Sequence, residues 1–167
     1  ANGRDDRPVE PVRKVQSIGR EITFPKDLRS PQEAKEALLK LAGEVGWRLR
    51  RAGQRAHTVQ LKLRLGDFST FTRQRTFDVP LCYDEDLYEA ACALFDAMKR
   101  PPGGIRLLGI SGSGFDEAGE LSLFDDSQKK ERLYTAIDTL RQRYGENVLT
   151  RAPLLKKTEE GRNSPEK

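Results

Sequence analysis

The stretch from His57 to Val79 alternates apolar and polar residues, and this alternation limits the possible fold more than any other feature of the sequence. Its first half interleaves four aliphatic side chains with four polar ones: Val59, Leu61, Leu63 and Leu65 with Thr58, Gln60, Lys62 and Arg64. A period of two places the two sets on opposite faces of a β-strand. Gly66-Asp67 interrupts the pattern before a second run, Phe68 to Val79, so we predict a hairpin of two strands.

The polar face of this hairpin carries hydroxyls, amides and cations with hardly a carboxylate. Its members are Thr58, Gln60, Lys62, Arg64, Thr70, Thr72, Gln74 and Thr76. Such a surface suits a polyanion.

The second strand contains one irregularity. Arg73 and Arg75 share the parity of the apolar residues around them, so strict alternation would bury two arginines beside aromatic rings. Either a bulge shifts the register between Thr72 and Arg75, or the arginines lie past the edge of the covering helices. Both alternatives leave the two arginines available to a ligand.

Two further strands and two helices are predicted around the hairpin. Residues 12–24 and 105–115 have the pattern of strands. Ser30-Pro31-Gln32-Glu33 is typical of a helix start with a capping box, and Gly53 ends that helix. Asp84 is predicted to cap a second helix, and residues 101–104 are predicted to end it. The order βαββαβ predicts an α+β fold in which two helices cover one face of a four-stranded sheet and the other face is free.

The C-terminal end of the first helix holds three arginines and a tryptophan. We assign Arg48, Arg50 and Arg51 to the helix dipole and to no partner. We expect Trp47 to pack at a helix edge rather than serve as a platform for a ligand.

Two glycine-containing segments allow a functional interpretation. Gly19 lies within the first strand, where it marks either a bulge or a close approach of a phosphate to the backbone. Ser111-Gly112-Ser113-Gly114 lacks the ending of a nucleotide-binding loop and opens no helix, so we reject a nucleotide site there.

Composition fits one domain with tails. The chain has 167 residues, of which 36% are hydrophobic and 34% charged. Residues 12–114 hold 18 lysines and arginines against 12 aspartates and glutamates, an excess of six positive charges. Two cysteines, Cys82 and Cys92, are too few for a disulfide scaffold, so we expect reduced thiols in a cytoplasmic protein. No apolar run is long enough to span a membrane, and Ala1-Asn2-Gly3 is expected to be a cut inside a longer protein.

The parts outside the central domain are assigned as follows. We predict a linker over 1–11, the domain over 12–115, a second linker over 116–125, a helix and extension over 126–155, and a disordered tail over 156–167. In the C-terminal helix, one stripe is apolar and consists of Leu133, Ile137, Leu140 and Tyr144.

Five stretches occur in the order typical of one domain family. They are Gly3 to Val9, the Ser17-Ile18-Gly19-Arg20 core of residues 12–21, Leu61 to Arg75, Phe77 to Pro80, and Ile105 to Gly112. Together they resemble the little-finger domain of Y-family translesion DNA polymerases of the DNA polymerase IV (DinB) type. The resemblance implies a module that grips primer-template duplex DNA beside the active site, mostly through phosphates, which position a protein without reading sequence.

The resemblance also implies which residues make these contacts. Ser17, Ile18, Gly19 and Arg20 would hold one DNA strand through backbone amides and one cation. The other strand would be held by Thr72, Arg73, Arg75 and Thr76, with Lys62 and Arg64 on the free face. Gln16 stands where the family often has lysine, so one expected charge is missing.

No catalytic or metal-binding residue is expected in this chain. In the family, the carboxylates that hold Mg²⁺ for nucleotidyl transfer lie in the palm, upstream of the matching region. Asp84-Glu85-Asp86 is the densest acidic cluster, but it opens a helix, where negative charge favours the dipole. We therefore expect the chain alone to bind DNA, to need no cofactor and to polymerise nothing.

Glu120-Leu121-Ser122-Leu123-Phe124 resembles the peptide with which such polymerases bind the sliding clamp. Glu120 replaces the usual glutamine, so one amide donor is lost. The alternative is that the apolar residues of this segment only fasten the following helix to the domain. A sliding clamp and duplex DNA are thus the expected partners of a monomer that contacts no membrane.

Two rival functions remain open. The chain could be an adaptor that acts mainly by docking the clamp, or a free-standing RNA-binding module. Binding through phosphates falls steeply with salt, whereas docking of an apolar peptide does not, and this separates the adaptor from the DNA-binding domain.

Overall fold

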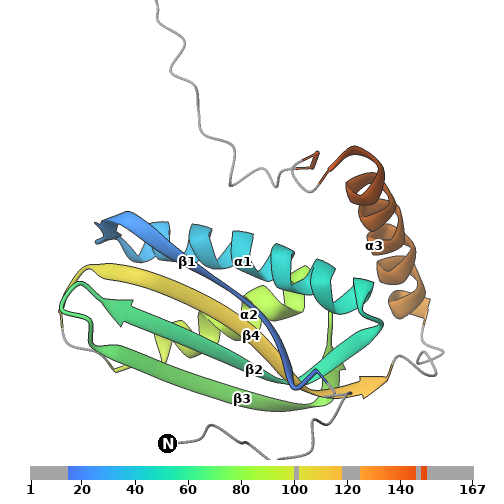
Figure 1. Ribbon diagram of the computed structural model, residues 1–167. Coiled ribbons are helices and arrows are strands. Elements are labelled where there is room, and N and C mark those ends of the chain that lie inside the picture. Colours follow the sequence, from blue (N-terminus) through green and yellow to red (C-terminus); the bar gives the residue numbers. More distant parts are fainter. Residues whose placement is uncertain (1–14, 100–101, 118–124, 146–147, 150–167) are drawn as a thin grey trace, which may run out of the picture.

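The computed structural model describes residues 15–99, 102–117, 125–145 and 148–149 (Figure 1). The elements follow the predicted order: β1 Ser17–Leu28, α1 Pro31–Arg51, β2 Gln54–Leu65, β3 Thr70–Leu81, α2 Asp84–Asp96, β4 Ile105–Glu117 and α3 Asp125–Tyr144. The strands form one antiparallel sheet in the order β1-β4-β2-β3. The predicted α+β fold, with its C-terminal helix, is confirmed.

Both α1 and α2 lie on one face of the sheet, and the other face is open (Figure 1). α1 packs mainly on β1 and β4, whereas α2 packs on β2 and β3. The core between the layers is aliphatic and includes Leu38, Leu41, Val45 and Leu49 of α1, Leu87 and Phe95 of α2, and Val59, Leu61, Leu63, Leu108 and Ile110 of the sheet. The predicted alternation in β2 is confirmed, since every second side chain from Val59 to Leu65 is buried in the core.

The capping box of α1 is confirmed. The Ser30 side chain accepts a hydrogen bond from the Gln32 backbone at 3.1 Å, and the Glu33 carboxylate accepts one from the Ser30 backbone at the same distance. Trp47 packs as expected, since it is buried at the end of α1. The capping box is local in sequence, which is why the pattern alone predicts it.

The assignment of Asp84 as a helix cap is wrong. Tyr83 is the N-cap residue of α2, and no side chain caps it. Asp84 is instead buried, 1% exposed, with its Oδ1 2.8 Å from Nη1 of Arg50. A buried carboxylate needs such a partner, because leaving it unpaired in the interior is costly.

Arg50 is the centre of a polar network that holds α3 against the domain. Its guanidinium donates to Asp138 of α3 through Nε at 2.7 Å and Nη2 at 2.9 Å, and to the Cys82 carbonyl at 2.7 Å. Burial would lower the pKa of Arg50, but hydrogen bonds to Asp138 and Asp84 outweigh it and raise the pKa. The assignment of Arg50 to the helix dipole alone is therefore wrong.

α3 packs on the domain through a polar and aromatic face. Tyr134, 1% exposed, stacks on Tyr83 with ring centroids 4.9 Å apart and lies 4.4 Å under the Arg50 guanidinium. Lys130 reaches Asp86 of α2 at 2.7 Å. The apolar stripe of this helix takes little part in this packing, because three of its four residues are exposed: Leu133, Leu140 and Tyr144.

Candidate nucleic-acid interface

The open face of the sheet consists of rows that cross all four strands. Residues paired across antiparallel strands point to the same face, so the register of the strand pairs assigns each row. One row contains Ser17, Ser113, Thr58 and Thr76, and the next contains Gly19, Ser111, Gln60 and Gln74. The third contains Glu21, Gly109, Lys62 and Thr72, and the fourth contains Thr23, Leu107, Arg64 and Thr70. This face presents hydroxyls and amides and holds no aromatic side chain in these rows.

The open face is less cationic than the hairpin alone suggests. Nζ of Lys62 forms an ion pair with Glu21 of β1 at 2.9 Å. Arg64 donates from Nε to the Thr70 hydroxyl at 2.9 Å and forms no ion pair among the described residues. Glu21 therefore neutralises Lys62, one of the two cations predicted on this face. The open face thus provides mainly hydrogen-bonding groups and little net positive charge.

Arg73 and Arg75 lie on the helix-side face of β3, at the edge of the sheet. Their partners across the strand pair are the core residues Leu61 and Val59. The register runs unbroken between Thr70 and Thr76, so no bulge occurs there and the second predicted alternative holds. Because β3 is an edge strand, both arginines are nevertheless exposed.

The β3 arginines are free to meet an anion. No carboxylate forms an ion pair with either one in the described part of the chain. Arg75 rests over the Phe77 ring, with 5.0 Å between its Cζ and the centroid. Contact with a ring face holds a guanidinium in place while its N–H groups stay available.

The other edge, β1, carries the second predicted group. The register is regular between Ser17 and Thr23, so Gly19 marks no bulge. A Cβ on Gly19 would lie 2.7 Å from the Cβ of Ser111, so glycine is needed for the close approach of β4. Packing within the sheet thus explains this glycine without a phosphate.

α1 fixes the β1 edge from the helix side. Nη1 of Arg48 donates to the Gly19 carbonyl at 3.0 Å, so this arginine too has a partner beyond the helix dipole. Arg20 pairs with Glu44 of α1 at 2.9 Å and keeps 48% of its side chain exposed. As an edge strand, β1 still presents backbone N–H groups on the side away from β4.

The structure therefore divides the ten predicted contact residues between two faces. Ser17, Gly19, Lys62, Arg64, Thr72 and Thr76 share the open face. Ile18, Arg20, Arg73 and Arg75 lie on the helix side of the two edge strands. The set forms a rim on both edges with a hydrogen-bonding surface between them.

His57 is a neighbour of this surface that the sequence pattern did not single out. Its Nδ1 lies 2.8 Å from the Phe77 carbonyl of β3, and its Nε2 lies 2.7 Å from Oδ2 of Asp116 on β4. Both contacts are satisfied only when both ring nitrogens carry protons. The bond to Phe77, and then that to Asp116, raises the pKa of His57.

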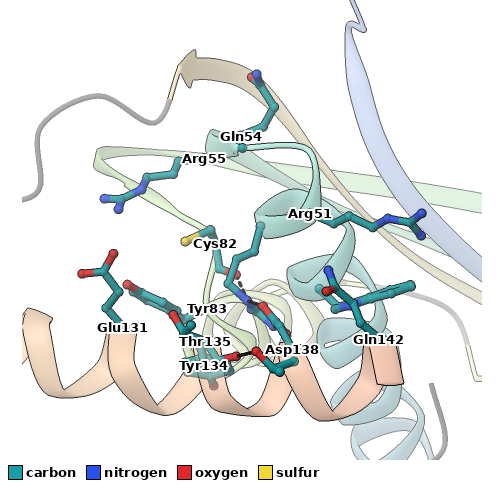
Figure 2. Close-up of a pocket in the computed structure, with 14 residues that line it drawn as sticks. Arg51, Gln54, Arg55, Cys82, Tyr83, Glu131, Tyr134, Thr135, Asp138 and Gln142 are labelled. Carbon is teal, nitrogen blue, oxygen red and sulfur yellow. Dashed lines mark hydrogen bonds and ion pairs between the residues drawn. The ribbon is translucent and has the colours of Figure 1, made fainter. Parts of the chain in front are cut away.

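A cavity of about 390 Å³ lies between α3 and the ends of α1 and β2 (Figure 2). Arg51 and Arg55 line it but point toward opposite sides, while Asp138 is engaged with Arg50 (Figure 2). No predicted contact residue lines it. The cavity is therefore separate from the candidate interface.

The described residues show no other kind of site. No three His, Cys, Asp or Glu side chains among them are grouped so that they could hold a metal ion. No helix in this part of the chain has the length and apolarity to cross a membrane.

Comparison with known protein families shows to which family the chain belongs. Residues 15–123 match the model of the impB/mucB/samB family C-terminal domain. The chain belongs to this family. This match, together with the relatives and the solved structure described next, confirms the expected relation to the little-finger domain of Y-family polymerases of the DNA polymerase IV type.

Relatives of this little-finger domain agree with the assignment. It is 33% identical to DNA polymerase IV of Clostridium kluyveri over 95% of the chain and 43% of that protein. It is 36% identical to DNA polymerase IV of Moorella thermoacetica over 91% of the chain and 39% of that protein. The chain thus spans about two fifths of the length of the curated relatives it matches.

Solved structures share the fold. A structure described as a complex of the beta-clamp processivity factor and the little-finger domain of PolIV superposes with a TM-score of 0.51, at 24% identity, over 65% of this chain and 97% of that one. A Y-family DNA polymerase chimera gives a TM-score of 0.54 at 19% identity, over 65% of this chain and 30% of that one.

The clamp-binding-like peptide of this little-finger domain, Glu120 to Phe124, lies outside the described residues. The linker over 1–11 and the tail over 156–167 also lie outside them.

Proposed function

We propose that this domain grips duplex DNA through the phosphates of both strands and acts as the little finger of a Y-family DNA polymerase. The observation that carries the proposal is the pair of exposed arginines, Arg73 and Arg75, on one edge of an open hydrogen-bonding sheet. Neither arginine has a carboxylate partner in the described chain.

The dimensions of the sheet support this proposal. Four strands spaced by about 4.8 Å place the outer two about 14 Å apart. The major groove of B-DNA is about 12 Å wide. A sheet lying over this groove would bring β1 near one phosphate backbone and β3 near the other.

The chemistry of the contacts suits a polymerase. On β3, Arg73 and Arg75 would bind phosphates together with the hydroxyls of Thr72 and Thr76. On β1, backbone amides near Ser17 to Gly19 would bind phosphates. Arg20 would add a cation whose charge is partly neutralised by Glu44. Lys62 and Arg64 lie between, on the open face. Contacts of this kind hold any sequence, which a polymerase that moves along its template requires.

Catalysis would belong to other parts of the polymerase. The chain matches about two fifths of each DNA polymerase IV relative, and the family resemblance assigns the Mg²⁺-binding carboxylates to the palm. We expect the chain alone to bind DNA as a monomer, in the cytoplasm, without polymerising nucleotides.

We infer that the same domain docks a sliding clamp through Glu120 to Phe124. The peptide resembles clamp-binding motifs, and the little finger of PolIV named above is described in complex with a beta-clamp. Two leucines and a phenylalanine would enter an apolar groove, and tethering would raise the effective concentration of the enzyme at the primer end.

Salt dependence of duplex binding tests the DNA proposal. Replacing both arginines, Arg73→Ala with Arg75→Ala, is expected to weaken binding equally for all sequences and to reduce the slope of log K against log salt by about 1–2. Lys40→Ala with Lys99→Ala removes the same charge from exposed positions outside the interface and should leave binding nearly unchanged. Equal losses in both double variants would show only a general charge effect.

Deletion of residues 120–124 tests clamp docking separately. Retention of the clamp by the deleted chain would contradict the role of the peptide. Loss of the clamp with unchanged duplex binding is the expected result, and it would show that the two functions use different surfaces.

A further inference from the structure

Exposed large apolar side chains concentrate on α3 and just after it. Five of the eight such residues in the described chain belong to 133–149: Leu133 (53% exposed), Leu140 (40%), Tyr144 (60%), Val148 (42%) and Leu149 (40%). Isolated exposed leucines need no explanation, but a cluster on one helix does. Neither the DNA interface nor the clamp-binding peptide uses these residues.

The cluster forms a stripe with a defined spacing. Leu133, half-buried Ile137, Leu140 and Tyr144 follow one another at intervals of four, three and four residues. This is the spacing of the apolar seam in a coiled coil, where a second helix covers it. The domain cannot cover it, because α3 packs through Tyr134, Lys130 and Asp138 on a different side.

Basic residues border the stripe. Lys129, Arg132 and Arg143 are all exposed, and the helical period places them beside the stripe, on the side away from the domain. Arg143 rests 5.4 Å from the Tyr144 ring centre. Among the side chains that the structure describes, which in α3 begin at Gln128, no carboxylate pairs with these three cations.

We propose that this stripe docks an amphipathic helix of another protein, whose flanks are acidic. The seam spacing requires a helical partner with an apolar face, and the basic border selects carboxylates next to that face. An antiparallel second copy of this chain would bring the two basic borders together, and a parallel one would set each border against the side of α3 that packs on the domain through Tyr134. Duplex DNA would meet the border but would leave the apolar stripe in water. This surface is independent of the DNA proposal.

Designed peptides serve as probes of the surface. One 18-residue helix carries leucines at the seam positions and glutamates at the flanks, and its matched control carries lysines at the flanks. With the whole chain, the glutamate-flanked peptide is expected to bind at least about tenfold more tightly by fluorescence anisotropy, and rising salt should reduce the difference.

Variants assign the binding to the stripe. Leu133→Asp with Leu140→Asp is expected to reduce affinity by about tenfold or more. Gln32→Asp with Ala93→Asp adds the same charges to exposed positions of α1 and α2, away from the basic border, and should change affinity little. Thermal unfolding midpoints should stay equal, since all four positions are exposed.

Several results would overturn the proposal. Equal binding of both peptides, or no loss in the leucine variant, would show that the stripe is not a selective helix site. Concentration-dependent dimers abolished by Leu133→Asp would assign it to a second copy. Binding seen only after removal of 150–167 would assign it to the tail of this chain. Loss of duplex DNA binding in the leucine variant would assign it to nucleic acid.

Discussion

At the scale of single residues, position decides what each arginine does. Arg48, Arg50 and Arg51 occupy one helix turn, and the sequence gives them the same role. In the structure Arg48 binds the β1 backbone, Arg50 joins α3 to the domain, and Arg51 lies over the Trp47 ring at 5.4 Å. Their partners are distant in sequence, 88 residues in the case of Arg50 and Asp138, so no local pattern predicts them.

Arg50→Ala should strongly destabilise the fold. The change removes the cation that forms ion pairs with both Asp84 and Asp138. Because Asp84 is buried, losing its partner costs about 3 kcal/mol or more. Urea unfolding of the chain measures this loss. Arg51→Ala is the control, since Arg51 is exposed and should cost about 0.5 kcal/mol or less. Similar losses for the two neighbours would contradict the network described here.

His57 should make stability depend on pH. Because its pKa is raised in the folded state, protonated His57 stabilises the fold below its ordinary pKa of about 6.5, and this stabilisation is lost as pH rises through the folded pKa. The difference in unfolding midpoint between the wild-type chain and His57→Gln should therefore be larger near pH 5 than near pH 9. A difference that grows toward alkaline pH would mean that neutral His57 is the stabilising form. His57 is the only histidine, so its NMR titration gives the pKa directly.

At the scale of elements, two glycines of α1 leave different amounts of space beside the first residue of α2, Asp84. Gly43 and Gly46 lie one turn apart on its buried side, close to Asp84. A Cβ on Gly46 would lie 2.5 Å from Oδ1 of Asp84, whereas one on Gly43 would lie 3.5 Å from Oδ2. The two glycines therefore differ in how much space they leave.

The glycine pair predicts opposite effects of the same substitution. Gly46→Ala should destabilise by about 1–3 kcal/mol, because Asp84 is held by Arg50 and cannot move away freely. Gly43→Ala has room and should stabilise by up to about 1 kcal/mol through helix propensity. Urea unfolding of both variants checks the contrast. A stabilising Gly46→Ala would show that the contact with Asp84 is not tight.

α3 marks the limit of pattern reasoning at this scale. Its period correctly predicts a helix, and its apolar stripe is correctly located in the sequence. The stripe does not show which side of the helix packs on the domain, because α3 packs through its polar and aromatic side. The surface of the domain under α3 is charged and aromatic. Asp138 of α3 pairs with Arg50, which also pairs with Asp84, and Tyr134 of α3 stacks on Tyr83.

At the scale of the whole molecule, the sequence predicts the layers but not the neighbours across them. Alternation and capping are local, and from them follow the strands, the helices and the open face. The strand order brings Glu21 to Lys62, 41 residues away, and this lowers the charge of that face. The positive rim accordingly lies at the sheet edges, where Arg73 and Arg75 remain exposed.

Mapping duplex DNA onto the chain by amide chemical-shift changes tests the central proposal most directly. We expect the largest changes along the two edge strands, at 17–20 and 72–76, with smaller ones near Lys62 and Arg64 and none on the outer surfaces of α1 and α2. Changes centred on α3 or on the outer helix surfaces, with both sheet edges unaffected, would contradict the proposal that the sheet grips both phosphate backbones.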